Sequence, residues 1–120
     1  MTQYKGLMDK LTKFNEERQR LNEVVSHYAK SGMKKFLHLD HITYEAGSLD
    51  KRTKEMLGLV SSLVLRCDDC ILYHLTQCLQ LGITPGEILE VLEVGLLVGG
   101  SITIPHIRRA IDVMDQSIKK

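Results

Sequence analysis

The sequence predicts an all-α protein, a single domain of about six helices packed as a bundle. Leu, Val, Ile and Met supply most of the apolar residues, whereas aromatic residues make up only 5% and tryptophan is absent. This composition is typical of helices packed through aliphatic side chains rather than of strands rich in aromatic residues. Apolar residues also recur three and four positions apart, and glycine, proline and capping residues separate the apolar segments. Within one domain spanning 1–120, residues 1–47 are expected to hold N-terminal helices and residues 48–117 the core.

The segment 4–28 predicts a long amphipathic helix. Its apolar residues form a single stripe between charged residues, and such a stripe packs on a core or on a neighbouring subunit. Ser31 and Gly32 are expected to end this helix, because glycine commonly follows a helix C-terminus. A shorter helix is expected within 33–46, before a break at Gly47.

Two helices are expected next, over 51–65 and 67–81. Asp50 is the expected N-cap of the first, which is apolar on more than one side and should therefore be central. The second begins at Cys67, with Asp68 or Asp69 as its cap, and stops before the glycine that follows Leu81.

The last two helices have clear start signals. Thr84, followed by proline and then by Glu87, predicts a capping box with proline in the first helical position. The final helix is expected from Ser101 or Ile102 to about residue 117, with Pro105 confined to its first turn.

A glutamate, two cysteines and a histidine form the pattern that carries the chemistry. Glu55 is followed by Cys67-x-x-Cys70-x-x-x-His74, and the two cysteines and the histidine lie on one face of one helix. A helix start favours a thiolate, because unpaired N–H groups and the positive end of the helix dipole lie there. Three cysteines do not make a secreted disulfide framework, which leaves a redox-active dithiol or half of a metal site.

In a redox centre, His74 would take the thiol proton and Glu55 would hold the other ring nitrogen. Cys70 as a thiolate would attack the O–O bond of a peroxide and become a sulfenic acid, which Cys67 would resolve as a disulfide. The adjacent Asp68 and Asp69 oppose this chemistry, because negative charge beside a thiol disfavours the thiolate. Two alternatives stay open. Cys67, Cys70 and His74 could bind zinc, with Cys78 or His106 as the fourth ligand, or the two cysteines could simply pack in the core. Zinc is not the favoured interpretation, because the sequence has no second pair of cysteines.

Several residues near the pattern have secondary roles. His106 and Tyr73 are candidate pocket residues, whereas Cys78 is expected to be a small buried apolar residue. Arg108 and Arg109 could bind an anionic substrate, but they are expected to face solvent.

The spacing E-x11-C-x2-C-x3-H, together with Leu49–Glu55, Leu81–Thr84 and the helix that starts near Glu87, resembles the alkylhydroperoxidase D-like branch of the carboxymuconolactone decarboxylase family. The resemblance covers about 49–114. It implies an all-helical fold, a homotrimer or homohexamer, and a thiol peroxidase or disulfide-reductase activity that needs no cofactor or metal. By analogy, Cys70 matches the peroxide-reacting cysteine, Cys67 its resolving partner, His74 the base and Glu55 the carboxylate of a proton relay.

The resemblance also implies the partners, namely a peroxide substrate and an external dithiol reductant of the lipoyl or thioredoxin-like kind. Two other functions stay open: a lactone-processing enzyme like the decarboxylase branch, and a non-catalytic helical module that senses redox state or binds zinc. Deleting the dithiol separates the first of these, because acid–base chemistry at His74 and Glu55 would survive without thiols.

Charge and hydropathy exclude other classes of protein. The formal net charge is +1 and no basic block stands out, so no nucleic-acid partner is expected. The longest nearly uncharged run, 56–65, is too short to span a bilayer, so no membrane association is expected. Residues 1–6 lack the apolar segment of a signal peptide, and a cytoplasmic location is expected.

Overall fold

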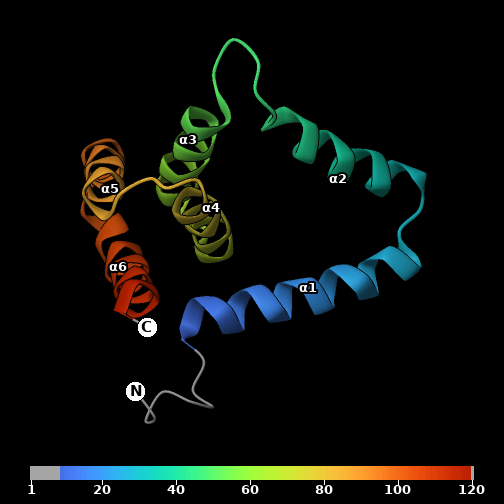
Figure 1. The fold of residues 1–120 in the computed structure, drawn as a ribbon, viewed down its shortest axis with the longest axis horizontal. Helices are drawn as coiled ribbons and strands as arrows, with labels where there is room; N and C mark the ends of the chain where they lie inside the picture. The colour runs from blue at the N-terminus through green and yellow to red at the C-terminus, as the bar shows by residue number, and fades with distance from the viewer. Residues whose placement is uncertain (1–8, 120) are drawn as a thin grey trace.

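A computed structural model describes residues 9–119, and this part of the chain consists of helices and their connections, without a β-strand (Figure 1). The all-α prediction is confirmed. The elements in order are α1 (Lys10–Tyr28), α2 (Ser31–Thr43), α3 (Lys51–Val64), α4 (Asp68–Gln80), α5 (Pro85–Gly99), the short 3₁₀ turn η2 (Ser101–Thr103) and α6 (Ile104–Lys119).

The core lies among α3, α4, α5 and α6, with the first turns of α1 closing one side. α3 packs against both α4 and α5 and is the central helix, as its apolar sequence predicts. Aliphatic side chains fill this core, which is the packing that the low aromatic content indicates. The buried apolar residues are Leu11, Leu59, Leu63, Ile71, Leu75, Cys78, Ile83, Ile88, Leu92, Ala110, Val113 and Met114.

Local capping residues set several helix ends as predicted. Asp50 accepts a hydrogen bond from the Thr53 N–H at the start of α3. Thr84 and Glu87 form the reciprocal capping box of α5, with proline in its first turn. Gly82, with φ of 79°, follows α4 in the left-handed conformation that an L-residue adopts only with strain.

Two predicted helix boundaries are wrong. Ser31 and Gly32 do not end α1, which stops at Tyr28; they are the first two residues of α2. α6 begins at Ile104, because residues 101–103 form the 3₁₀ turn instead. The predicted start of the first helix, at residues 4–8, lies outside the described residues.

The second half of α1 and all of α2, residues 21–43, form a projecting segment that we call the arm. Figure 1 shows α1 and α2 joined at an angle and reaching away from the other helices before the chain returns to α3. No residue of α2 is buried. The large apolar side chains exposed on the arm are Leu21, Val24, Val25, Tyr28, Met33, Phe36, Leu37, Leu39 and Ile42. Among the described helices, none has the length and hydropathy required to span a membrane.

Candidate active site

The centre of the site is a buried pair between α3 and α4. His74 Nδ1 lies 2.8 Å from Glu55 Oε1, and the two side chains are 9% and 1% exposed. A carboxylate only accepts hydrogen bonds, so we assign the ring hydrogen to Nδ1. This assignment leaves the lone pair on Nε2, so the nitrogen that can take a proton points away from Glu55.

Glu55 is held on the inner face of α3, one turn after Lys51. Lys51 Nζ lies 3.5 Å from Glu55 Oε2, which is close enough for an ion pair. Among the described residues, however, no group makes a hydrogen bond to Oε2. Burial of a carboxylate is costly unless it is paired; the hydrogen bond from His74 and the positive charge of Lys51 stabilise this one.

Gly58 makes room for the His74 ring. A Cβ atom at this position would lie 2.6 Å from His74 Cε1, closer than non-bonded carbon atoms approach one another. Gly58 lies one turn after Glu55 on α3, so the same helix face supplies both the partner of the ring and the space for it. Sequence reasoning missed this role, because nothing marks a helical glycine as a packing position.

Tyr44 is a second residue that the sequence analysis missed. Its hydroxyl lies 3.3 Å from His74 Nε2, and with the hydrogen on Nδ1 the phenol is the donor. Lys54 holds the loop that carries Tyr44, because its Nζ donates to the carbonyl oxygens of Thr43 and Glu45 at 2.9 and 2.7 Å. Burial raises the pKa of Tyr44, and the charges of Asp40 and Glu55 raise it further. The phenol therefore stays protonated near neutral pH.

The two cysteines of the pattern form a disulfide at the start of α4, with Cα atoms 5.3 Å apart. Cys67 is the N-cap residue of α4, and its sulfur accepts from the Cys70 N–H at 3.3 Å. The prediction that Asp68 or Asp69 caps this helix is therefore wrong. Arg66, which follows the C-cap of α3, has φ of 59° in the left-handed conformation, and the Cys67 N–H then donates to the Ser62 carbonyl at 3.1 Å. This tight turn joins α3 to α4 and places Cys67 at the N-terminus of α4.

The negative charge of Asp68, next to the two cysteines in the chain, is paired with side chains of α6. Its Oδ1 lies 2.7 Å from His106 Nδ1, and its Oδ2 lies 3.0 Å from Arg109 on α6. Partial burial by itself raises the pKa of Asp68, but the hydrogen bonds from His106 and Arg109 outweigh it and lower the pKa overall. Arg109 is exposed to solvent, as expected, and it is also paired with Asp68.

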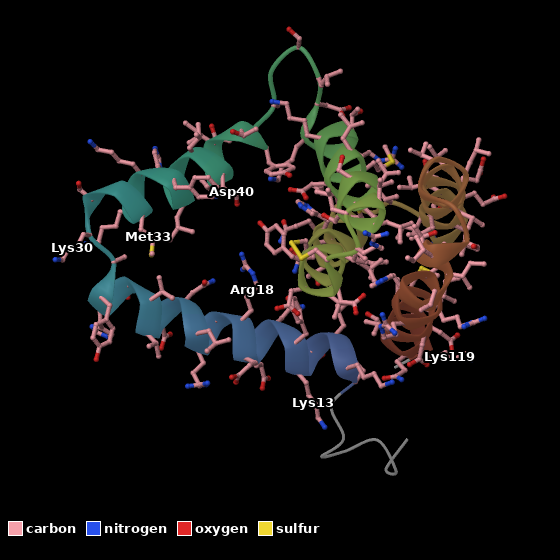
Figure 2. All side chains as sticks on the ribbon, turned by 180° about the vertical axis from the view of Figure 1, so that it is seen from behind. Lys13, Arg18, Lys30, Met33, Asp40 and Lys119 are labelled. Carbon is pink, nitrogen blue, oxygen red and sulfur yellow. A yellow bond between two sulfur atoms is a disulfide. The ribbon has the colours of Figure 1, made fainter. Side chains whose placement is uncertain are left out.

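A cavity of about 470 Å³ lies between α4 on one side and α1 and α2 on the other, and Cys70 and His74 line it. Cys70, Tyr73 and His74 line it from α4, and Arg18 and Asp40 are among the residues that line it from α1 and α2. Figure 2 shows Arg18 pointing from α1 into the space enclosed by the arm, and the disulfide lies on the side of α4 that faces this space. The Arg18 guanidinium lies 4.1 Å from the centre of the Tyr73 ring, a cation–π contact.

The structure therefore brings most of the predicted site residues together. Glu55 bonds His74, and the same cavity is lined by Cys70, Tyr73 and His74. His106 is not among the residues that line this cavity; it lines a smaller one of about 180 Å³ beside α6. Cys78 is fully buried, as predicted, and burial raises the pKa of its thiol to about 12.

Side chains suited to a metal do not gather anywhere in residues 9–119: no three His, Cys, Asp or Glu residues are grouped as a coordination set. Cys78 and His106, the two residues considered as a fourth zinc ligand, lie in the core and on α6 respectively. His106 Nδ1 is hydrogen-bonded to the Asp68 carboxylate instead.

Comparison with known proteins gives a consistent picture. The family model for carboxymuconolactone decarboxylases matches residues 31–113. The protein called uncharacterized protein 4 in the cox locus of Paracoccus denitrificans is 30% identical over 81 residues, which cover 68% of this chain and 73% of that protein.

Solved structures agree with the family match. Two crystal structures of one Thermotoga maritima protein are 50% identical to this chain, cover 89% of it and 94% or 91% of their own chains, and have TM-scores of 0.86 and 0.84. One is described as a carboxymuconolactone decarboxylase family protein with a suggested part in an antioxidative response. A Legionella pneumophila family protein, 23% identical with a TM-score of 0.81, covers 91% of this chain and 97% of its own and shares the fold. The chain belongs to the carboxymuconolactone decarboxylase family.

Proposed function

We propose that this protein is a thiol-dependent peroxidase or a closely related dithiol–disulfide oxidoreductase. The observation that carries the proposal is a disulfide-forming Cys67–Cys70 pair beside a histidine that is held by a buried carboxylate. Structural cysteines have no need of such a base, whereas a reactive thiol needs a group to accept its proton. The suggested antioxidative role of the Thermotoga maritima protein points in the same direction.

The two cysteines differ in exposure, and this difference supports separate roles. Cys70 is exposed and lines the cavity, whereas Cys67 is half-buried. In the proposed cycle the Cys70 thiolate attacks the distal oxygen of a hydroperoxide. The O–O bond breaks, the sulfur becomes a sulfenic acid, and the leaving alkoxide takes a proton to form an alcohol.

His74 and Glu55 handle the protons of this step. The Nε2 lone pair accepts the proton of the Cys70 thiol, and the resulting imidazolium returns a proton to the leaving oxygen. Glu55 keeps the other ring hydrogen on Nδ1 and stabilises the imidazolium by its negative charge. Since Tyr44 donates to Nε2 in the disulfide form, its hydroxyl must release that lone pair before His74 accepts a proton.

The cycle closes in two further steps. The Cys67 thiol attacks the sulfur of the Cys70 sulfenic acid, which forms the disulfide and releases water. An external dithiol, lipoyl or thioredoxin-like, then exchanges with the disulfide and leaves as a disulfide itself, which restores both thiols. Peroxide is thus reduced by two electrons that come from the external dithiol. No bound cofactor or metal takes part in this scheme.

The test is peroxide titration of the reduced protein and of single-cysteine variants. Cys70→Ser should lose peroxide-dependent oxidation, and Cys67→Ser should stop at a sulfenic acid that dimedone traps. Cys78→Ala is the matched control and should oxidise like the parent, because the Cys78 thiol is buried. If Cys70→Ser consumes peroxide as fast as the parent, the proposal fails. Lactone-processing activity that persists in the Cys67→Ser/Cys70→Ser protein would instead support acid–base chemistry at His74.

A further inference from the structure

We propose that His106 and Arg109 form a clamp on Asp68 that sets how readily the Cys67–Cys70 dithiol reacts. The inference deepens the proposed redox function and rests on it. His106 and Arg109 come from α6, outside the E-x11-C-x2-C-x3-H pattern, and neither residue lines the cavity that contains Cys70. They act through Asp68 and are therefore positioning residues for the two thiols.

The contacts of the clamp define its hydrogen positions. The carboxylate of Asp68 accepts at Oδ1 from His106 Nδ1 at 2.7 Å, so this nitrogen carries a hydrogen. Arg109 Nε donates to Oδ2 at 3.0 Å, and Arg109 Nη2 lies 3.0 Å from the same oxygen. Arg109 Nη2 also lies 3.2 Å from His106 Nδ1, but with a hydrogen on that nitrogen it cannot be the acceptor. Both donors are therefore directed to one carboxylate.

The place of Asp68 in the chain explains why its charge matters. It is the first residue of α4 and lies between the two cysteines in sequence. A carboxylate there suits the helix dipole, but the same negative charge disfavours a thiolate next to it. Arg109 supplies the compensating positive charge from α6, so the helix start keeps its advantage for the thiols.

The clamp also leaves the first turn of α4 to the cysteines. An aspartate at a helix start readily accepts first-turn N–H groups. With both oxygens of Asp68 bonded to α6, the Cys70 N–H donates to the Cys67 sulfur instead. A sulfur that accepts a backbone hydrogen bond is better stabilised as a thiolate than one that does not.

The experiment measures the rate at which iodoacetamide alkylates the reduced protein at pH 7, with mass spectrometry to locate the label on Cys67 and Cys70. Arg109→Gln leaves Asp68 uncompensated and should slow alkylation about threefold to tenfold at low salt. His106→Leu should slow it in the same direction. Arg109→Lys keeps the charge and should recover most of the rate. Arg108→Gln, the exposed neighbour, loses the same charge outside the clamp and should stay within about twofold of the parent.

Two further measurements test whether Arg109 acts through Asp68 and whether its action is electrostatic. In a protein that carries Asp68→Asn, adding Arg109→Gln should change the rate less than it does in the parent, because the carboxylate that Arg109 holds is gone and only the direct effect of the Arg109 charge on the thiols remains. The Arg109→Gln effect should also shrink in 1 M salt, where the Debye length is about 3 Å. An Arg109→Gln effect of equal size with and without Asp68→Asn would overturn the clamp, and so would an effect that salt does not change.

Alkylation requires no peroxide, so the two proposals fail separately. A protein whose alkylation depends on Arg109 and Asp68 but which never reacts with peroxide overturns the peroxidase function and leaves the clamp in place. A protein that reduces peroxide, and whose alkylation rate is the same in Arg109→Gln as in the parent, overturns the clamp alone.

Discussion

At the scale of single residues, the site depends on which nitrogen of one imidazole carries the hydrogen. Glu55 fixes it on Nδ1 because it is buried, 2.8 Å away and able only to accept. Proximity of an acid and a histidine in the sequence would not settle this point. The burial of Glu55 settles the position of the hydrogen, because an exposed glutamate would form hydrogen bonds with water in place of the histidine ring.

Glu55→Gln should keep the geometry of His74, since the amide oxygen can still accept from Nδ1, but it removes the charge that stabilises the imidazolium. We expect kcat for peroxide reduction to fall about 100-fold, within the range found for general acid–base groups. The measurement is steady-state peroxide consumption across pH. Glu90→Gln, which changes an exposed glutamate on α5, is the control and should leave kcat unchanged. A Glu55→Gln protein with parental kcat would refute the relay.

Gly58 is the residue on which the position of the ring depends. Gly58→Ala would place a methyl group 2.6 Å from His74 Cε1, so the ring must move or the helices must separate. We expect a loss of about 1–3 kcal/mol in the free energy of unfolding, as for other overpacked sites. Urea denaturation measures it. Gly86→Ala is the control, because a Cβ atom added at this helical glycine would lie 3.9 Å from its nearest neighbour, Thr84 Oγ1. This variant should be neutral or slightly stabilising. Equal stabilities of the two variants would show that the site is not tightly packed.

At the scale of the helices, α3 and α5 are tied by an ion pair as well as by apolar packing. Arg52 on α3 contacts Glu87, which also belongs to the capping box of α5. The hydrogen bond from Arg52, followed by the backbone hydrogen bond of the capping box, lowers the pKa of Glu87 from its usual 4.5 to about 2. The charged form of Glu87 is therefore favoured by folding.

Glu87→Gln keeps a side chain that can complete the capping box but removes the ion pair. Because the folded-state pKa is lower than the unfolded one, the ion pair contributes to stability above about pH 4.5, and this contribution is lost as the pH falls to about 2. We expect the parent to be more stable than the variant at pH 7 and equally stable near pH 2. Urea midpoints across this range test it. A stability difference that does not change with pH would assign the effect to capping rather than to charge.

The sequence predicted those elements whose causes are local. Asp50, Thr84 and Gly82 mark helix ends through their own backbone and neighbouring N–H groups, so these boundaries are where the sequence placed them. The cap of α4 was missed because Asp68, a good capping residue, is bonded from α6 instead. The prediction that Ser31 and Gly32 end a helix is wrong because both residues are also tolerated in a first helical turn, where they begin α2.

The candidate site follows the same division. The spacing of Cys67, Cys70 and His74 on one helix is a local property that the sequence alone reveals. Tyr44 was missed because its contact with His74 joins residues 30 positions apart through a loop of irregular structure. No periodicity or motif predicts which tyrosine such a loop presents.

At the scale of the whole molecule, the single chain is more extended than a domain of its length. Its radius of gyration is 15.4 Å, whereas about 14 Å is usual for a compact domain of this size. The arm accounts for the difference, because α2 buries none of its residues. Phe36, on α2, is 68% exposed and Leu97, on α5, is 85% exposed. Exposed apolar side chains in such number are typical of surfaces that a partner covers, and we propose that other copies of this chain are that partner.

We therefore expect self-association in solution, and the family resemblance implies a homotrimer or homohexamer; light scattering coupled to size exclusion measures the assembly. Phe36→Glu should shift the population toward the monomer, because it places a charge in the apolar surface of the arm. Lys35→Glu, a neighbouring exposed position, is the control and should leave the assembly intact. A parent protein that elutes as a clean monomer at micromolar concentration would contradict this expectation.

The most direct test of the proposed chemistry is a single-turnover balance of thiols and peroxide. Fully reduced protein is mixed with one equivalent of an organic hydroperoxide, free thiols and remaining peroxide are counted, and a dithiol is then added. We expect one peroxide consumed and two thiols lost per chain, with Cys67 and Cys70 recovered as a disulfide by mass spectrometry and both thiols restored by the dithiol. Peroxide left unconsumed, while Cys67 and Cys70 stay reduced, would contradict the account.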